Sequence, residues 1–325
     1  MKNVESGQVA LTCDRGWLVR ILAMSKATGH NSRDTQYGRY WVCLYTRDGA
    51  ATLSKTLESI MKQTKEAEFI VAVDDGSNDS TPTILRNCSK VAMVRTESKT
   101  RNILRAPRLI NMAYARAEDM GIPEYCMITG DDCIYPSDYA AKLLKIMDCD
   151  PALVIASGGW NMKASPDMMR LPQGAGRVVR ECFMKTIGGR YPERYGWEAW
   201  LLYKAMQMGY RVLALRELRY THARAYSGTQ TFNWGRGMQT LGYDVLFVLA
   251  RLAKNMLSRS EPLDPSANLT MLAGYLSGFL PTSDYSKPFD SDLREFIRQS
   301  QHIRMVNTIR LVLTRITERV LRRRP

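Results

Sequence analysis

The chain has 325 residues and a formal net charge of +14, with 46 lysines and arginines against 32 acidic residues. The apolar share of 45% and the charged share of 24% are ordinary for a globular protein and predict a sizeable core. No window of 18 uncharged apolar residues is present, which excludes a predicted membrane-spanning helix. The positive charge predicts an anionic partner: nucleic acid, a membrane surface or a phosphorylated substrate.

The N-terminal segment MKNVESGQVALTCDRGW lacks a cationic region followed by an apolar core, so no signal peptide is expected. Seven cysteines are an odd number and form no C-x-x-C pair. Cys43 and Cys126 lie inside apolar runs, where cysteine behaves as a small hydrophobe. These features indicate a reduced chain. We expect a cytoplasmic protein, either free or peripheral on the cytoplasmic face of the membrane.

Residues 1–38 show no clear period and are treated as an N-terminal extension. Beyond them, short apolar runs alternate with amphipathic segments. Strands are predicted at 40–46, within 67–81, and at 90–94, 125–129 and 152–157. Helices are predicted at 49–64, from Ser80 or Thr81 with Pro82 in the first turn, at 106–121 and at 136–147. This alternation predicts βαβ units and a mostly parallel sheet.

Three acidic loops follow predicted strands: TRD at 46–48, DDGSND at 74–79 and GDD at 130–132. Ligands of such sheets bind outside the carboxyl ends of the strands, so we expect the three loops to converge. Converging carboxylates repel one another unless a cation compensates. Mg²⁺ or Mn²⁺ is typically held by one or two carboxylates together with substrate phosphates. The loops therefore predict a site for Mn²⁺ or Mg²⁺ and a phosphorylated ligand.

Three stretches resemble the family 2 inverting glycosyltransferases, which have the GT-A fold. VCLYTRDGAATLSKTLESIMKQTKEAEFIVAVDDGSNDST is similar to the nucleotide-binding half of that family. NMAYARAEDMGIPEYCMITGDDCIYPSDYAAKLL resembles the stretch that leads to its metal-binding acidic motif, and IGGRYPERYGWEAWLLYKAMQMGYRVLAL resembles its acceptor segment. The resemblance covers roughly residues 40–225.

The resemblance implies an α/β fold: a GT-A type, Rossmann-like, mostly parallel sheet flanked by helices. Residues 39–225 would form the catalytic domain, and residues 226–325 a helical, basic C-terminal region. The implied activity moves a sugar from a nucleoside diphosphate sugar, UDP-sugar first and GDP-sugar second, to an acceptor hydroxyl or a lipid phosphate. Such transfer serves the assembly of glycans, lipid-linked saccharides or surface polysaccharides.

The resemblance also assigns roles in nucleotide binding. Asp75, the second acid of VDDGS, would contact the base, and Thr46 and Asp48 lie in the slot that frames the same nucleotide. Arginine forks match phosphate oxygens, so arginines before the helix at 106–121 are expected to reach the diphosphate, or else to form a solvated basic loop. These are Arg101, Arg105 and, as the preferred candidate, Arg108.

The acidic motif of the family, D-x-D, reads Gly130-Asp131-Asp132-Cys133 here, so one flanking acid is missing. The resemblance therefore assigns the metal to Asp132, and ribose or water-mediated contacts to Asp131. His222, in RYTHARAYSG, falls where relatives often carry a histidine after the last strand. It is expected either to ligate the metal or touch the diphosphate, or to be structural.

Glu198 sits at the acid position of GWEAW and would deprotonate the acceptor hydroxyl. Many relatives have Glu-Asp at this place, whereas this chain has Ala199 after the glutamate. Three alternatives follow: Glu198 is the base, the base is displaced, or activity is low. A solvated residue that opens a helix is the structural alternative.

The last hundred residues are predicted to be helical, with one helix over 229–257 and another over 268–280. Residues 302–322 show the clearest amphipathic pattern, and several arginines lie off its apolar stripe. Such a helix, within 302–325, would lie on an anionic membrane surface and suit a lipid-linked or saccharide acceptor. The alternative is that its stripe packs on the catalytic domain or on another copy.

Other functional classes fit less well. A nucleotidyltransferase would need a glycine-rich phosphate loop in the first βα unit, and TRDGAATL is a poor one. A nucleic-acid-binding protein would spread basic residues among exposed aromatics, whereas here they crowd the C-terminus, so no nucleic acid partner is expected. A catalytically silent relative that binds nucleotide sugars remains the main alternative, because of Ala199 and Gly130.

Overall fold

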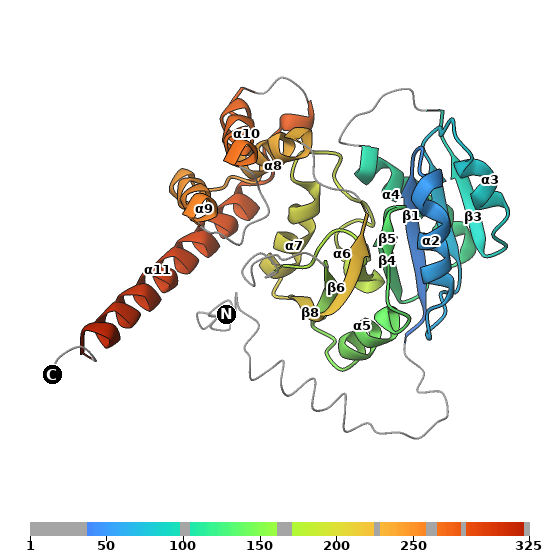
Figure 1. Cartoon of the computed structure of the whole chain (residues 1–325), viewed down its shortest axis with the longest axis horizontal. Coiled ribbons are helices and arrows are strands. Elements are labelled where there is room, and N and C mark those ends of the chain that lie inside the picture. The colour runs from blue at the N-terminus through green and yellow to red at the C-terminus, as the bar shows by residue number, and fades with distance from the viewer. Residues whose placement is uncertain are drawn as a thin grey trace, which may run out of the picture. The chain divides into compact units, whose positions relative to one another are not determined.

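The computed structural model describes residues 38–97, 105–160, 171–223, 228–257, 265–280 and 284–321 (Figure 1). The predicted extension at 1–38 lies outside these residues except for residue 38. The chain divides into two compact units, Met1–Glu193 with Trp197–Tyr226 and Arg194–Gly196 with Ser227–Pro325. The sequence did not predict that residues 194–196 group with the second unit. Each unit is described by itself.

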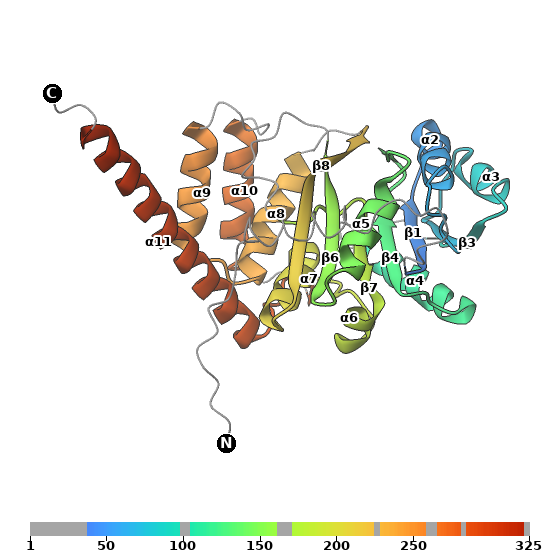
Figure 2. The ribbon, with the colours of Figure 1, turned by 90° about the horizontal axis from the view of Figure 1, so that it is seen from below.

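A single eight-stranded sheet organises the first unit, in the order β3-β2-β1-β4-β7-β6-β8-β5 (Figures 1 and 2). Strands β3, β2, β1 and β4 run parallel, β7 pairs antiparallel with both β4 and β6, and β6 pairs parallel with β8. The strands are β1 (Tyr40–Thr46), β2 (Ile70–Asp74), β3 (Val91–Arg95), β4 (Tyr125–Thr129), β5 (Cys133–Ile134), β6 (Leu153–Trp160), β7 (Arg177–Arg180) and β8 (Arg211–His222).

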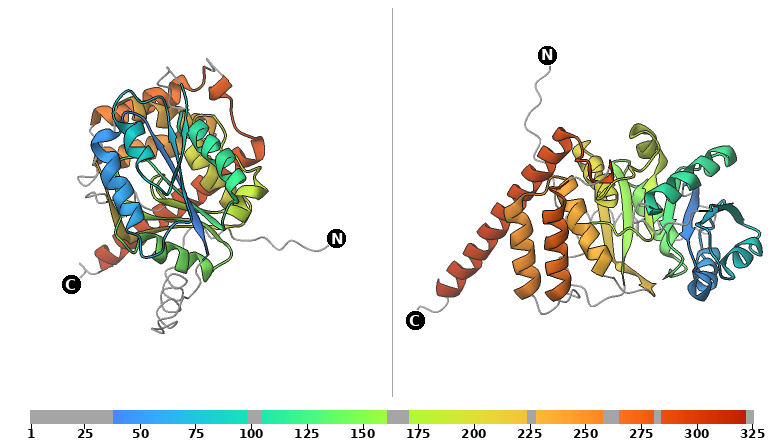
Figure 3. Two further views of the ribbon diagram at one scale, coloured as in Figure 1. Left: turned by 90° about the vertical axis from the view of Figure 1, so that its right-hand side faces the viewer. Right: turned by 90° about the horizontal axis from the view of Figure 1, so that it is seen from above.

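Helices cover both faces of this sheet (Figure 3). Alternate residues of β1 point to opposite faces, as the pleat of a strand requires. Val42 packs in one core cluster with Leu57 and Leu143, so α2 and α5 lie on that face. Trp41 makes an edge contact with Tyr114 of α4 on the other face. The helices are α2 (Ala50–Met61), α3 (Thr81–Arg86), α4 (Arg105–Met120), α5 (Tyr139–Asp148), α6 (Glu181–Thr186) and α7 (Trp197–Gln207).

The predicted fold class is confirmed: an α/β sheet flanked by helices, followed by a helical region. The first and fourth strands, 40–46 and 125–129, begin and end as predicted, because each is a bulky apolar run that is buried throughout. The pattern did not reveal β5 or β7. Both strands are short, and each joins the sheet by antiparallel pairing with a strand that is distant in the sequence: β7 with β4, and β5 with β8.

The second unit consists of α8 (Gly228–Thr240), α9 (Val245–Leu257), α10 (Pro265–Ser277), the 3₁₀ turn η2 (Asp284–Ser286) and α11 (Ser291–Leu321). The expectation of one helix over 229–257 is wrong. Gly242 adopts a φ of 73°, which suits glycine and ends the first helix. Asp244 then accepts hydrogen bonds from the backbone N–H groups of Leu246 and Phe247, and so caps the second helix.

The amphipathic segment predicted at 302–322 is part of α11, which starts eleven residues earlier, at Ser291, and ends at Leu321. Residues 322–325 lie outside the described part of the chain. Among the helices that the structure describes, none combines the length and apolarity needed to cross a membrane.

A buried carboxyl group lies beside helix α4, near the amino end of β4 and so at the opposite end of this strand from the loop at 130–132. Glu181 begins α6, is almost fully buried, and accepts a hydrogen bond from Nε1 of Trp41 at 3.1 Å. It lines a pocket of about 220 Å³ together with Tyr114 and Lys185. Burial raises the pKa of Glu181 from 4.5 to about 7.

We predict that Glu181→Gln stabilises the protein at pH 8 by about 3 kcal/mol, because a shift of one pKa unit corresponds to about 1.4 kcal/mol. The folded state binds the proton more tightly than the unfolded state, so stability falls as the pH rises from 4.5 to about 7. Chemical denaturation at pH 5 and pH 8 measures the effect. The variant should gain little at pH 5.

Glu118→Gln is the matched control, since Glu118 is an exposed acid at the same pocket. It should leave the free energy of unfolding within about 0.5 kcal/mol at either pH. Equal stabilisation by both substitutions would contradict the assignment of the effect to the buried carboxyl.

Candidate functional site

The acidic loops meet at one edge of the sheet. Thr46, the last residue of β1, is in register with Asp74 of β2, and Leu44 is in register with Thr129 of β4. Parallel pairing therefore brings the carboxyl ends of the three strands together. Asp75 N–H donates to the Thr46 carbonyl at 3.0 Å, which joins the first two loops directly.

Asp48 links the first loop to the second through both its backbone and its side chain. Its N–H donates to Ser77 Oγ at 2.8 Å, and its Oδ1 accepts from the N–H of Asn78 at 2.9 Å. Its φ of 50° lies in the left-handed region, which aspartate tolerates better than most residues. The two loops thus hold each other in one conformation beyond the ends of β1 and β2.

Asp75 is buried between basic side chains. Its Oδ2 lies 3.2 Å from Nε of Arg105 and 3.4 Å from Nη1 of Arg47, and its Oδ1 accepts from Thr96 Oγ1 at 2.9 Å. Burial lowers the pKa of Arg105, the positive charge of Arg47 adds to this, and Asp75 opposes it. Arg108, the preferred arginine of the sequence analysis, is exposed one turn further along α4. Of the arginines expected before and within α4, Arg105 contacts Asp75, and Arg101 lies outside the described residues.

Asp131 is held between β1 and α2. Its Oδ2 accepts a hydrogen bond from Thr46 Oγ1 at 2.5 Å, and its carbonyl accepts one from Thr56 Oγ1 at 2.9 Å. Gly49 makes this approach possible, since a Cβ atom there would lie 2.0 Å from Asp131 Oδ2. The first of the two adjacent acids therefore has a fixed orientation.

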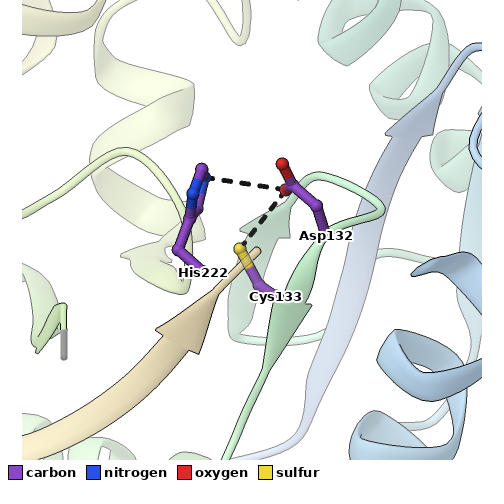
Figure 4. Close-up of side chains that lie close together, drawn as sticks. All are labelled: Asp132, Cys133 and His222. Atoms are coloured by element: carbon purple, nitrogen blue, oxygen red, sulfur yellow. Dashed lines mark hydrogen bonds and ion pairs between the residues drawn. The ribbon is translucent and has the colours of Figure 1, made fainter. Parts of the chain in front are cut away.

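Asp132 and His222 come together through the pairing of β5 with β8. Cys133 is the register partner of His222, and the N–H of Ala223 donates to the Asp132 carbonyl at 2.9 Å. Asp132 Oδ1 lies 3.6 Å from His222 Nε2 and 3.6 Å from Cys133 Sγ (Figure 4). Among the described residues, these three side chains form a group whose ligand atoms lie within 4.8 Å of one another.

The donor set of this group suits a hard divalent cation. A carboxylate oxygen and an imidazole nitrogen are ligands that Mn²⁺ accepts, and two protein ligands leave most of the coordination shell to water or phosphate oxygens. Cys133 is fully buried in the hydrophobic core, and burial raises the pKa of its thiol. A protonated thiol is a poor metal ligand. The Asp132–His222 pair therefore fits Mn²⁺, whereas Mg²⁺, which prefers oxygen ligands, would use Asp132 without the imidazole.

Glu198 lies in the first turn of α7, and its side chain is 43% exposed. Arg177 of β7 is the register partner of Ile128, near the carboxyl end of β4, and its Nη2 lies 3.4 Å from Glu198 Oε1. Glu198 therefore lies at the carboxyl edge of the sheet, the edge from which the loop with Asp131 and Asp132 follows β4.

Arg177 of β7 is a site residue that sequence reasoning missed. It is 2% exposed, and Nη2 lies 3.4 Å from Glu198 Oε1. Its guanidinium also donates to the carbonyls of Gln173 at 3.0 Å, Pro172 at 3.2 Å and Glu198 at 3.3 Å. Nothing in RVVR indicates this role, because the insertion of β7 into the sheet was not predicted. Arg47, which lies 3.4 Å from Asp75, was also missed, although it stands within the TRD loop at 46–48 from which Thr46 and Asp48 were chosen.

Solved structures with a similar fold include a mannosyltransferase, PcManGT from Pyrobaculum calidifontis, in complex with GDP-Man and Mn²⁺. It is 15% identical, with a TM-score of 0.53 over 91% of this chain and 88% of that one. The S. aureus TarS fragment 1–349 in complex with UDP is 16% identical, with a TM-score of 0.48 over 75% of this chain and 72% of that one. No curated protein matches in sequence.

A family model supplies the stronger comparison. The model of glycosyl transferase family 2 matches residues 41–207, which is more than half of the chain. The match includes the three acidic loops, Arg177 and Glu198, whereas His222 lies beyond it. The chain therefore belongs to glycosyl transferase family 2.

Proposed function

We propose that the protein is an inverting glycosyltransferase that moves a sugar from a nucleoside diphosphate sugar to an acceptor hydroxyl or lipid phosphate. The observation that carries the proposal is the convergence of Asp75 with its arginines, the Asp132–His222 pair and Glu198 at the carboxyl edge of one sheet. This is the edge at which α/β sheets bind nucleotides.

The donor would bind in the slot formed by the first two loops. Asp75 would contact the base, and Thr46 and Asp48 would frame the nucleotide. Arg105, with Arg108 further along the helix, would face the diphosphate, because guanidinium forks match phosphate oxygens. A UDP-sugar is the first choice and a GDP-sugar the second. PcManGT, which shares the fold, was solved with GDP-Man.

Asp132 would hold Mn²⁺ or Mg²⁺, with His222 as the second ligand of Mn²⁺, and Asp131 would make ribose or water-mediated contacts. When bound, such an ion neutralises negative charge on the diphosphate. The support lies in the 3.6 Å separation of Asp132 Oδ1 from His222 Nε2 and in the chemistry of the two side chains. The Mn²⁺ in PcManGT is in keeping with this choice.

Glu198 would act as the general base. Its carboxylate would accept the proton of the acceptor hydroxyl while that oxygen bonds to the anomeric carbon. The bond from the anomeric carbon to the diphosphate oxygen would break, and its electron pair would leave with the diphosphate. Attack opposite the leaving group inverts the anomeric configuration. Because Ala199 replaces the acid that follows the glutamate in many relatives, a base elsewhere in the site is the alternative.

Arg177 would position this base without touching the substrate. Its guanidinium binds the carbonyl and one carboxylate oxygen of Glu198, and it also holds the chain at Pro172 and Gln173. The second carboxylate oxygen would then be the one that receives the proton. A fixed base is more effective than a mobile one, because proton transfer depends on geometry.

The acceptor is proposed to be a saccharide or lipid-linked molecule, in keeping with the basic helical region. Residues 302–325 are proposed to contact an anionic membrane surface from the cytoplasmic side. Ile303 and Val306 of that segment are exposed. Residues 322–325 lie outside the described residues, and most side chains from 309 to 321 do as well.

We predict that one of UDP, GDP, CDP and dTDP raises the melting temperature, and that it does so only with Mn²⁺ or Mg²⁺. A ligand that binds only the native state stabilises it, so a thermal-shift panel identifies the donor base. Asp132→Asn should abolish the metal-dependent part of the shift. Asp138→Asn, at an exposed acid, is the control. If no nucleotide raised the melting temperature, a catalytically silent relative would be favoured. If the metal-dependent rise were unchanged in Asp132→Asn, Asp132 would not be a metal ligand.

We predict that Glu198→Gln lowers the transfer rate by about 10²- to 10⁴-fold, which is the usual contribution of a general base. The affinity for the nucleotide should stay unchanged, since the substitution removes only a proton acceptor. Transfer assays and calorimetric titration with the nucleotide measure the two effects. Glu217→Gln, at an exposed glutamate of β8, should transfer at the native rate. If Glu198→Gln transferred sugar at the native rate, Glu198 would not be the general base and another residue would have that role.

We predict that Arg177→Met destabilises the protein by about 2–3 kcal/mol, because three carbonyl groups lose a donor worth about 1 kcal/mol each. Transfer should also fall under conditions where the variant is folded. Chemical denaturation and transfer at saturating donor test the two effects. Arg116→Met, at an exposed arginine of α4, is the control for both. If the variant lost stability but kept the native turnover rate, Arg177 would stabilise the fold without positioning Glu198.

A further inference from the structure

The second unit exposes a set of large apolar side chains on α9, on α10 and in the turn directly after α10; the two helices contact each other (Figure 2). We call this set the apolar face. It comprises Val245, Leu246, Leu249, Leu269, Leu276, Phe279 and Leu280. Their exposed fractions run from 46% for Leu249 to 72% for Leu280, although leucine is normally buried.

On α9 the apolar residues occupy more than the side that meets the core. Val248 and Leu252 are buried in the cluster that holds this unit together. Leu246 and Leu249 lie on another side and are exposed, and Lys254 follows Leu246 on the same row at intervals of four residues. The helix thus has a buried apolar side, an exposed apolar side and a basic border.

On α10 the contrast with a water-facing helix is stronger. Met271 and Tyr275 point into the core of the unit, while Leu269 and Leu276 are exposed. Residues 265–283 contain no charged side chain at all. A helix whose outer side faces water normally carries charged residues there. The outer side of α10 is therefore suited to an apolar environment.

Charge identifies the occupant of the apolar face. Residues 227–301 contain seven basic and seven acidic residues, so the excess of positive charge in this unit lies in 302–325 and not at the apolar face. The described residues of α9 and α10 nevertheless carry Arg251 and Lys254, both exposed, and no acidic residue. A second copy of the chain would bring the same positive charge to the contact, whereas an anionic lipid surface complements it.

We propose that the apolar face docks onto an anionic lipid surface, with α9 and α10 lying in the plane of the headgroups. Each helix has 13 residues, too few to span a bilayer but enough for interfacial binding. The leucines enter the acyl boundary, and the basic side chains meet lipid phosphates. This surface is separate from the segment 302–325 and does not depend on the transferase activity.

The test is co-sedimentation of the full chain with vesicles of phosphatidylcholine alone or mixed with phosphatidylglycerol. Native protein should bind the anionic vesicles, and added salt should weaken binding. Leu246→Ser with Leu249→Ser, and Leu269→Ser with Leu276→Ser, should each lower the partition coefficient by at least about tenfold. These substitutions add no charge, so a loss reports lost apolar contact.

Matched controls come from the first unit, where Met61 and Met208 are exposed apolar residues. Met61→Ser with Met208→Ser should bind vesicles as the native protein does. Arg251→Gln with Lys254→Gln should weaken binding to anionic vesicles only. Removal of 302–325 distinguishes the apolar face from the C-terminal segment. Any vesicle binding that remains after this truncation is due to the apolar face, and it should be lost when the leucine substitutions are added to the truncated chain.

Three outcomes would overturn the proposal. The first is no binding of native protein to anionic vesicles, and the second is native binding by both leucine variants. The third is a native dimer that the leucine variants convert to monomer, measured by light scattering, while their vesicle binding is unchanged. In that case the apolar face joins two copies. None of these readouts uses a nucleotide, so each is distinct from a failure of the transferase proposal.

Discussion

The antiparallel pairing of β5 with β8 is the constraint on which the candidate site depends. β5 is only two residues long and begins directly after Asp132. Its register places Cys133 opposite His222, and the Ala223 N–H holds the Asp132 carbonyl. A shift by one residue would turn the His222 side chain to the opposite face of the pair. Two residues that are 90 positions apart in the chain thus come within 3.6 Å of each other.

The same edge of the sheet shows how a strongly cationic chain keeps several carboxylates together. Each acid has a neighbour of a different kind: a threonine hydroxyl that donates to Asp131, an imidazole 3.6 Å from Asp132, and two guanidinium groups beside Asp75. The hydrogen bond to Asp131 and the positive charges beside Asp75 offset repulsion between neighbouring carboxylates. The groups are held in place by the protein itself, which reduces the reorganisation that ligand binding requires.

The two units of the chain have different surfaces. The first brings three acidic loops together at the carboxyl edge of a sheet, where nucleotides bind in α/β folds. The second carries leucines in water and no charged residue over 265–283. The acidic loops of the first unit would suit a soluble nucleotide-sugar donor. The exposed leucines of the second unit would suit an acceptor that is associated with lipid. The two proposals rest on separate observations, and either can stand without the other.

The sequence by itself determined the fold class, the strands at 40–46 and 125–129, and the three acidic loops, because a buried parallel strand is a local apolar run that ends at a turn. The resemblance of these loops to a family also indicated the site residues. Only the tertiary structure decided that Arg105 rather than Arg108 contacts Asp75, that Arg177 holds Glu198, and that the predicted helix over 229–257 breaks at Gly242. Local patterns report which residues form a strand or helix. They do not report which distant segments pair, and the contacts of β5, β7 and Arg177 arise from such pairing.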